Sequence, residues 1–444
     1  AVASRFHASR SDLIPASRRA AAPRFAPGAL SRYDKSNVST RAPECSVVRQ
    51  FLGSAMNVLV LNAGSSSLKF QLMNTKTREI FTKGNCEKIG LEEGIFGHSE
   101  GGEKVKETVV LPDHGTAVRM VIDLINEHGF EMDAIGHRIV QGGWHFTDSA
   151  LVDDDVLAKI YEVAPLAPLH NYAEAGVIEF CREAYPSIPN VAVFDTSFHM
   201  GMPEMSYTYP LPKEVREKYH VRKYGAHGTS HRYEWKTAKE MLGDRCHRLL
   251  SCHLGNGSSL CAIEDGVCRD TTMGLTPLDG LMMGTRCGSI DPATVCYLQR
   301  VGGYTADEVD TMMNKQSGIL AMYEKTSDAR DIREAALKGD EKALFTLDLF
   351  AYKAMLHSGS MIFSMAGVDT ITFAGGIGEN DWATRQAFCE FFEWLGVRVD
   401  RAKNKECVGG KGGVISAAGS SVTVVVIPTD EEYMISLDVE RLAK

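Results

Sequence analysis

Two stretches of this 444-residue chain share one pattern, and together they decide the fold class. The first is Asn57-Val58-Leu59-Val60-Leu61, followed by the turn Gly64-Ser65-Ser66-Ser67 and a second apolar run from Leu68. The second is residues 248–254, followed by Gly255-Asn256-Gly257-Ser258-Ser259 and Leu260. Each stretch predicts a strand, a polar turn and another strand. When Leu68 is aligned with Leu260, the two copies lie 192 positions apart. This repeat indicates that the chain consists of two halves with the same arrangement of strands.

The rest of the chain alternates short apolar runs with helical periodicity. We expect further strands at 191–194, 370–374 and 422–427. Apolar residues at 3–4 spacing predict helices at 171–185 and 341–365. Strands mixed with helices in this way favour the α/β class.

Composition excludes several classes of protein. The apolar run at residues 422–427, interrupted only by Thr423, is far shorter than the ~20 residues that a membrane span needs. The net charge is −9, and the chain after residue 50 carries −15, so a nucleic-acid partner is not expected. The 11 cysteines form no CxxC pair, and the gaps between Cys246, Cys252, Cys261 and Cys268 match no zinc signature. We therefore expect buried free thiols in a reducing compartment.

Residues 1–54 differ from the body of the chain. They are rich in Ala, Ser and Arg, and the first 50 hold eight Arg, one Lys and three acidic residues, a net of +6. This composition is typical of an organellar transit peptide, which predicts a soluble protein of the mitochondrial matrix or the chloroplast stroma. The alternative is a cytoplasmic protein in which these residues form a disordered tail without a targeting signal.

Several turns carry groups that suit phosphate chemistry. The turns of the two repeated hairpins offer backbone N–H groups and hydroxyls, and Lys69 adds a positive charge beside the first turn. The run Gly375-Gly376-Ile377-Gly378-Glu379-Asn380 ends a predicted strand and opens a helix, which lets backbone approach a flat or anionic ligand. No Walker P-loop occurs in the chain.

Charged residues next to glycines or strand ends are candidates for a reacting centre. Arg138 and Arg286 lie in glycine-bounded segments, and guanidinium groups bind carboxylates and phosphates bidentately. His227 and His231 are four apart, but the Glu of a zinc-binding HExxH motif is missing, so His227 fits better as a donor to a developing anion. Asp195 and Glu431 follow predicted strands, where carboxylates with phosphate oxygens can bind Mg²⁺.

Seven phrases in order resemble those of the acetokinase family. They are Leu61-Asn62-Ala63-Gly64-Ser65-Ser66-Ser67-Leu68-Lys69, Gly136-His137-Arg138, Val193-Phe194-Asp195-Thr196, His227-Gly228-Thr229-Ser230-His231, His253-Leu254-Gly255-Asn256-Gly257, Met283-Gly284-Thr285-Arg286 and Gly376-Ile377-Gly378-Glu379-Asn380. The resemblance covers residues 56–444. It implies two duplicated ribonuclease-H-like, actin-like ATPase domains around an interdomain active-site cleft, with boundaries at 56–198 plus 432–444 and at 199–431.

The resemblance also implies a reaction and the residues that serve it. The reaction is Mg²⁺-dependent transfer of a phosphoryl group from ATP to acetate, giving ADP and acetyl phosphate, by direct attack of the carboxylate in a homodimeric enzyme. The implied catalytic residues are Arg138, Asp195, His227 and Arg286. The implied ligands of the metal are Asn62, Asp195 and Glu431. The implied acetate-binding residues are Arg138, Val140, Leu169 and Pro277. The implied phosphate- and nucleotide-binding residues are Ser65, Ser67, Lys69, His170, His253, Asn256, Gly257, Gly375, Gly376, Gly378, Glu379 and Asn380.

Two positions depart from the family pattern. Ala226 stands where the family usually has Phe, which bears on the choice of acyl chain, and Ser289 stands where it usually has Asp. A propionate or butyrate kinase on the same scaffold is therefore an alternative. An alternative from another class is an actin-like nucleotide-binding assembly protein, which would not need the two arginines and His227.

Overall fold

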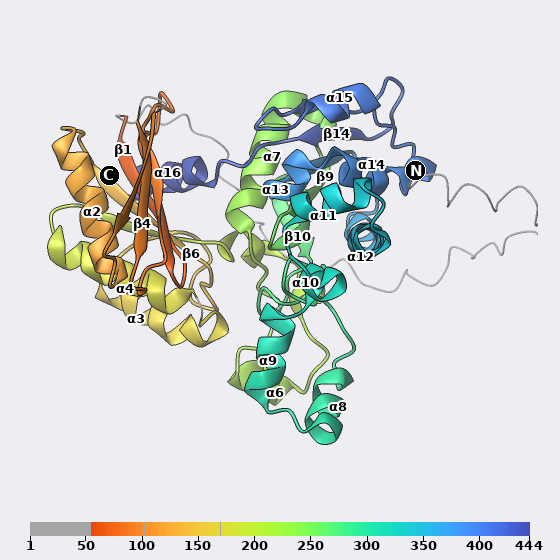
Figure 1. Cartoon of the computed structure of the whole chain (residues 1–444), viewed down its shortest axis with the longest axis horizontal. Helices are drawn as coiled ribbons and strands as arrows, with labels where there is room; N and C mark the ends of the chain where they lie inside the picture. The colour runs from red at the N-terminus through yellow and green to blue at the C-terminus, as the bar shows by residue number, and fades with distance from the viewer. Residues whose placement is uncertain (1–54, 101–102, 169) are drawn as a thin grey trace, which may run out of the picture. The chain divides into compact units, whose positions relative to one another are not determined.

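The computed structural model describes residues 55–100, 103–168 and 170–444, which form one compact unit. Residues 1–54, where the transit peptide is expected, and Leu169 lie outside the described residues. Two mixed sheets organise the unit, and helices cover them (Figure 1). No helix in the described part of the chain combines the length and apolar character that crossing a membrane requires.

The first sheet has eight strands, and their spatial order is β5-β4-β3-β2-β1-β6-β8-β7. Their bounds are β1 Asn57–Ala63, β2 Ser67–Asn74, β3 Ile80–Glu87, β4 Gly94–Glu100, β5 Glu103–Val109, β6 Ala134–Ile139, β7 Ala150–Leu151 and β8 Asn190–Phe194. Helices α2 (His114–Glu127), α3 (Asp154–Val163) and α4 (Asn171–Ala184) belong to this half, and α4 packs on β1, β6 and β8. The C-terminal helix α16 (Glu431–Leu442) also packs on β1, β6 and β8.

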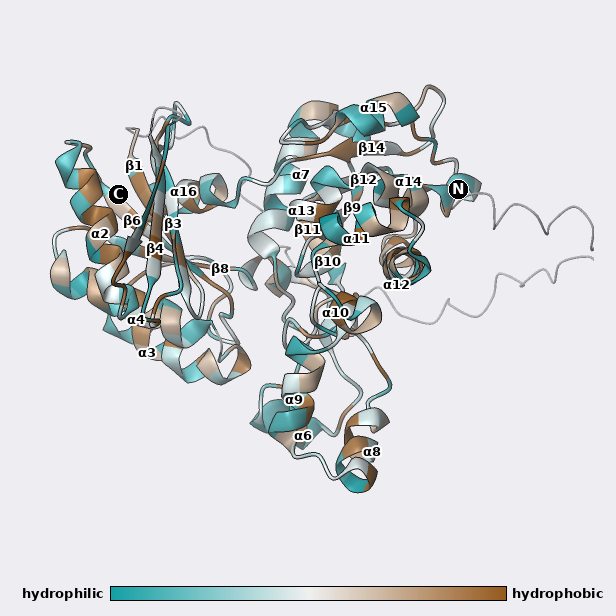
Figure 2. Ribbon diagram, viewed as in Figure 1, coloured by the Kyte–Doolittle hydropathy of each residue, from teal (hydrophilic) through white to brown (hydrophobic). Residues whose placement is uncertain are grey.

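The second sheet has six strands in the order β11-β10-β9-β12-β14-β13. Their bounds are β9 Arg248–Leu254, β10 Ser258–Glu264, β11 Val267–Thr271, β12 Thr370–Ala374, β13 Gly413–Val414 and β14 Thr423–Val426. Helices α7 (Gly228–Leu242) and α12 (Glu341–Ser364) pack on it, and α7 also contacts α16. The middle of β1 and most of β14 are hydrophobic and buried, as expected for strands covered on both faces (Figure 2).

The remaining helices are short or lie at the edges of the second half. They are α5 Glu204–Tyr207, α6 Lys213–Lys218, α8 Ala293–Gly302, α9 Ala306–Lys315, α10 Gly318–Tyr323, α11 Ala329–Leu337, α13 Gly375–Asn380, α14 Trp382–Glu390 and α15 Arg401–Glu406. Single turns of 3₁₀ helix are η1 Ala164–Leu166, η2 Ser197–Gly201, η3 Gly243–Arg245 and η4 Glu393–Leu395.

The expected duplication is present in the topology. In the first sheet β3-β2-β1 are antiparallel, and β1, β6 and β8 then follow in parallel. In the second sheet β11-β10-β9 are antiparallel, and β9, β12 and β14 follow in parallel. The two hairpins differ by one residue, however. The pair Ala63–Leu68 encloses four residues and the pair Leu254–Ser258 encloses three, so the alignment of Leu68 with Leu260 does not hold through both strands.

The α/β class with two sheets of one plan is thus confirmed. The expected boundaries of the two halves stay a prediction, and the packing of α16 on the first sheet is consistent with a C-terminal segment that returns to the N-terminal half.

Candidate active site

Arg138 is the centre of a cluster of charged residues at the ends of the parallel strands of the first sheet. It lies near the end of β6, where its Nη1 donates to Asn62 Oδ1 at 3.1 Å and its Nη2 donates to Asp195 Oδ2 at 2.5 Å. Burial alone would lower the pKa of Arg138, but the charges of Asp195, Glu431 and Glu174 raise it. Arg138 is therefore always a cation that holds carboxylate and amide oxygens in one place.

The oxygen atoms on one side of this cluster could bind a metal ion. Arg138 Nε lies 3.9 Å from Glu431 Oε2, and it is buried without a hydrogen-bond partner in the described part of the chain. Burial raises the pKa of Glu431 to about 7, and the charges of Arg138 and Lys69 act against that rise. Asn62, Asp195 and Glu431 thus supply hard oxygen donors around one arginine, which is the donor set that Mg²⁺ prefers.

His227 occupies a strained position directly before helix α7. Its φ of 56° and ψ of 23° place it in the left-handed region, which is uncommon for a residue with a side chain. The following Gly228 N donates to Asp195 O at 3.0 Å, and Thr229 Oγ1 donates to Asp195 Oδ1 at 3.0 Å. These bonds join the start of α7 to the end of β8. A Cβ on Gly228 would lie 2.1 Å from Asp195 O, so only glycine fits there.

Burial lowers the pKa of His227 well below its usual value, and the neighbouring His253, His231, Arg138 and Arg286 lower it further. The imidazole is therefore neutral near pH 7 and carries a single proton. Its Nδ1 lies 2.9 Å from Ser259 Oγ.

A buried row of polar groups extends from Ser259 into the core. Ser259 Oγ lies 2.8 Å from His231 Nε2, and His231 Nδ1 lies 2.6 Å from Ser251 Oγ. Beyond Ser251 is Glu234, whose pKa burial raises to about 7 against the hydrogen bond that Thr372 Oγ1 donates to its Oε2. All of these side chains are inaccessible to solvent. The row positions the Nδ1 side of His227 and leaves its Nε2 facing the turn at Gly257.

Arg286 faces the same turn as His227. A Cβ on Gly257 would lie 3.2 Å from His227 Nε2 and 3.6 Å from Arg286 Nη1, so both side chains point at this glycine. Arg286 Nη1 makes a 3.4 Å hydrogen bond to Pro277 O. Burial lowers the pKa of Arg286, and no carboxylate of the described residues counters this effect. An arginine without an acidic partner beside a polar turn is suited to bind an anion.

The turn that carries Gly257 is held by close packing. Gly284 N donates to Asn256 O at 2.9 Å, and a Cβ on Gly284 would lie 1.7 Å from Asn256 Oδ1. Gly255 is in turn adjacent to Gly376, because a Cβ on Gly255 would lie 3.7 Å from Gly376 N. The second hairpin turn therefore lies between the Arg286 segment and residues 375–380, the expected nucleotide-binding segment.

The expected nucleotide-binding segment, residues 375–380, forms the short helix α13 after β12. Gly375 has a φ of 74°, and a Cβ there would lie 2.8 Å from Leu254 O. Glu379 Oε1 accepts hydrogen bonds from Gly375 N, Thr429 N and Thr429 Oγ1, so this side chain supports the turn from within. Asn380 Oδ1 similarly accepts from Gly409 N at 2.8 Å. Because the side chains of Glu379 and Asn380 make these internal hydrogen bonds, we expect a ligand to contact the backbone around Gly376 and Gly378.

Other expected residues lie around the two arginines. The pKa of His170 is lowered to about 4 by burial and by the charges of Arg138 and Arg286. The pKa of His253 is likewise lowered to about 4, chiefly by burial. Both imidazoles are thus neutral donors or acceptors near pH 7. His253 Nδ1 lies 2.8 Å from Ser230 Oγ, and its ring centroid is 4.3 Å from that of His227.

The expected acyl-pocket residues belong to the two segments that carry the arginines. Val140 is buried beside Arg138, and Pro277 is the carbonyl partner of Arg286. Ala226 is buried against Met273 and Met283. Ser289, the other departure, donates to Asp279 Oδ1 at 2.6 Å in the loop that follows Arg286. Ser65 is exposed and Ser67 half-buried in the first hairpin turn, and Lys69 is exposed on β2, paired in register with Asn62.

Several residues of this site were not predicted from the sequence. Glu174 is buried on α4, accepts from Val140 N at 3.0 Å and has a pKa raised to about 8, chiefly by burial. The sequence marks Ser259 only as part of a turn, and it gives no sign of a role for Glu234. A buried acid inside a helix has the same sequence appearance as an exposed one, so only the fold identifies Glu174 and Glu234. Zinc at His227 and His231 is not supported, since serines occupy both nitrogens of His231.

Half-buried arginines, a neutral histidine and a carboxylate cluster that meet at glycine-rich turns of two duplicated halves define a phosphotransferase of the α/β class. Comparisons with known proteins agree. A family model described as the acetokinase family matches residues 57–437. A protein named acetate kinase from Anoxybacillus flavithermus is 49% identical over 393 residues, which covers 87% of this chain and 98% of that relative. The acetate kinase of Bacillus subtilis is 47% identical over 394 residues, covering 87% and 99%.

Solved structures give the same result. The acetate kinase of Porphyromonas gingivalis has a TM-score of 0.83 and 39% identity, and the match covers 88% of this chain and 100% of that one. A propionate kinase from Francisella tularensis has a TM-score of 0.83 and 37% identity, covering 87% and 100%. The chain belongs to the acetokinase family.

Proposed function

We propose that this chain is an acetate kinase, which transfers a phosphoryl group reversibly between ATP and acetate. The observation that carries the proposal is that Arg286 and His227 face the same glycine turn while a second arginine, Arg138, holds Asn62 and Asp195. Two anions that meet head-on need such a concentration of positive charge and donors.

In the proposed reaction a carboxylate oxygen of acetate attacks the γ-phosphorus of ATP. The bond from that phosphorus to the bridging oxygen breaks, and its electron pair leaves with ADP. The carboxylate is already ionised at pH 7, so no general base is needed. A loose phosphoryl transition state depends on positioning and charge stabilisation, which half-buried arginines supply.

Each side chain has a role in this scheme. Arg138 orients the carboxylate, with Val140 and Pro277 beside the methyl group; Leu169, which the resemblance adds to this lining, lies outside the described residues. Arg286 binds the transferring phosphoryl group, and the turns that carry Ser65, Asn256 and Gly376 bind the nucleotide. Neutral His227 donates from Nε2 to an equatorial oxygen. That tautomer follows if Ser251 donates to His231 Nδ1, His231 Nε2 donates to Ser259 Oγ, and Ser259 donates to His227 Nδ1.

The residues fit a magnesium ion. Asn62, Asp195 and Glu431 would hold it, directly or through water. When bound, Mg²⁺ supplies charge neutralisation at the phosphates.

The choice of acid is the finer part of the proposal. Acetate is favoured because the carboxylate contacts do not depend on Ala226. Propionate is the second candidate, because Ala226 is small and its neighbours are the flexible Met273 and Met283. Trapping of the acyl phosphate with hydroxylamine, using acetate, propionate and butyrate with ATP and Mg²⁺, tests both. Acetyl hydroxamate should form fastest. ATP hydrolysis without any hydroxamate would contradict the kinase and favour the nucleotide-gated assembly protein.

We also propose a homodimer. Apolar side chains are exposed along one stripe of α12, at Phe345, Tyr352, Leu356 and Phe363. Their spacings of seven, four and seven residues place them on one face of the helix, as in a helix–helix seam. Light scattering after gel filtration should give the mass of two chains for the wild type and of one chain for Leu356→Glu. A monomeric wild type would contradict the proposal.

A further inference from the structure

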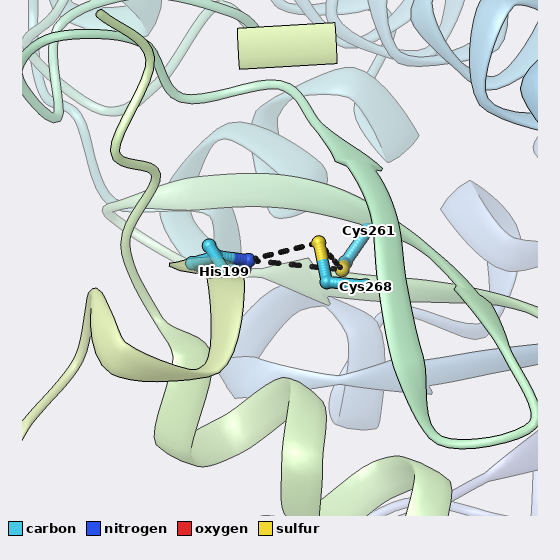
Figure 3. Close-up of side chains that lie close together, drawn as sticks. All are labelled: His199, Cys261 and Cys268. Atoms are coloured by element: carbon cyan, nitrogen blue, oxygen red, sulfur yellow. Dashed lines mark hydrogen bonds between the residues drawn. The ribbon is translucent and has the colours of Figure 1, made fainter. Parts of the chain in front are cut away.

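A second cluster of reactive side chains lies under the active site but takes no part in the proposed transfer. It consists of His199 on η2, Cys261 on β10 and Cys268 on β11 (Figure 3). All three side chains are completely buried in the same hydrophobic core cluster or against it. Among the described residues no other group of three or more His, Cys, Asp or Glu side chains has its ligand atoms gathered closely enough to hold a metal ion.

The three ligand atoms form a compact triangle. His199 Nδ1 lies 3.2 Å from Cys268 Sγ and 4.0 Å from Cys261 Sγ, and the two sulfurs are 3.5 Å apart. These sides place a point inside the triangle that is about 2.1 Å from all three atoms, close to the 2.0–2.3 Å of Zn–N and Zn–S bonds. Figure 3 shows the three side chains directed at this common point.

The hydrogen bond of His199 to a backbone carbonyl favours the tautomer that can bind a metal ion through Nδ1. His199 Nε2 lies 2.9 Å from Ala226 O, and a carbonyl can only accept, so Nε2 carries the hydrogen. In the neutral imidazole the lone pair is then on Nδ1, which faces the sulfurs. A histidine that donates its distal N–H to a backbone carbonyl while the other nitrogen faces soft donors is a recurring arrangement in metal sites.

We propose that His199, Cys261 and Cys268 form a structural site for a thiophilic d¹⁰ cation, Zn²⁺ or Cu⁺. Two sulfur donors and one imidazole select such ions over Mg²⁺ and Ca²⁺, which prefer oxygen. Binding releases the thiol protons, and two thiolates would balance the charge of Zn²⁺ in this apolar core. Cu⁺ accepts the trigonal set as it stands, whereas Zn²⁺ would draw on a fourth donor.

The site would also brace the catalytic segment. The same imidazole that would bind the metal holds Ala226, the residue before His227. It also packs against Gly225, where a Cβ would lie 2.6 Å from the His199 ring. A metal on Nδ1 would fix the orientation of His199, and hence of the Gly225–His227 backbone. This role is separate from the chemistry of transfer, and the site stands whether or not acetate is the substrate.

Metal binding can be measured directly on the full chain. The reduced protein is stripped with a chelator, saturated with Mg²⁺ to fill carboxylate sites, and given Zn²⁺ or, in a second arm, Cu⁺ under anaerobic conditions. After desalting, elemental analysis should find one ion per wild-type chain and almost none in Cys261→Ser or Cys268→Ser. Cys246→Ser is the matched control, because Cys246 is equally buried in the same core but outside the triangle, and it should retain the ion.

Two further readouts do not depend on the variants folding. Co²⁺ added to the stripped wild type should give the intense thiolate-to-metal charge-transfer absorption, and the bound ion should raise the Tm. The proposal is overturned if the wild type retains no ion, or if Cys261→Ser retains as much as the wild type. It is also overturned if the two sulfurs are isolated as a disulfide and the protein, once reduced, binds no ion, which would make them a redox pair.

Discussion

Replacement of Arg286 by lysine separates a role in the transition state from a role in the fold. Within the described part of the chain the Arg286 guanidinium makes one 3.4 Å hydrogen bond to a carbonyl and a 3.7 Å contact to Met283 Sδ. No carboxylate among the described residues pairs with Arg286, so the substitution removes only this hydrogen bond and the weak sulfur contact, about 0.5–1.5 kcal/mol of stability. Lysine keeps the charge and loses the planar fork.

The effect on the rate should be much larger than the effect on stability. Loss of one preorganised donor to a developing charge costs about 2.7–4 kcal/mol, or ~10²–10³-fold in kcat. We therefore expect Arg286→Lys to lower kcat at least ~10²-fold while Tm falls by no more than ~4 °C. Hydroxamate kinetics at saturating ATP and acetate, paired with thermal unfolding, measure both quantities.

Arg138→Lys is the contrasting variant. Arg138 bonds both Asn62 and Asp195, so its replacement leaves buried oxygens without a partner. It should lose both rate and stability, with a Tm clearly below that of Arg286→Lys. Near-normal kcat in both variants would refute the assignment of the arginines. A raised KM with unchanged kcat in Arg286→Lys would show binding that is equal in ground and transition states.

Three further predictions address other parts of the structure. Ser259→Ala removes the partner of His227 Nδ1 and should lower kcat by roughly 2–10-fold with the KM for acetate unchanged, as the loss of one neutral hydrogen bond implies; an unchanged kcat would count against the row of buried groups. Ala226→Phe should lower the ratio of kcat/KM for propionate over acetate by up to ~10–200-fold, the value of about one methylene, and a ratio that does not fall would mean that Ala226 does not set the pocket. Residues 1–54 fused to a fluorescent protein should enter an organelle, and a chain that starts at Met56 should keep full activity; cytosolic fluorescence would leave only the tail without an address.

Buried strands that are followed by a glycine were predictable from the sequence. The bounds expected for 248–254 and 370–374 match β9 and β12, because both strands are rich in aliphatic or β-branched residues and are followed by Gly255 and Gly375. Strands β3, β4 and β5 were not predicted. β5 is exposed along nearly all its length and carries charged residues, so neither alternation nor an apolar run marks it.

The candidate site was predictable where polar turns follow strands, and not where contacts join distant segments. Arg138 and Glu431 are 293 positions apart, and only the return of α16 to the first sheet brings them together. Free buried thiols were expected, and most cysteines in the described residues are buried, although Cys296 is exposed. The sequence spacing of Cys261 and Cys268 matches no metal signature, so their approach to His199 depends on the pairing of β10 with β11 and on η2 packing against β11.

Attack of an acetate oxygen on phosphorus, without cleavage of a carbon–oxygen bond, is the central claim, and isotope retention tests it most directly. Acetate labelled with ¹⁸O at both carboxylate oxygens is incubated with ATP, Mg²⁺ and the purified enzyme, and the acetyl phosphate is analysed by mass spectrometry. Attack at phosphorus breaks no carbon–oxygen bond, so every acetyl phosphate molecule should retain both labels. Loss of one label, or consumption of ATP with no acetyl phosphate formed, would contradict the account.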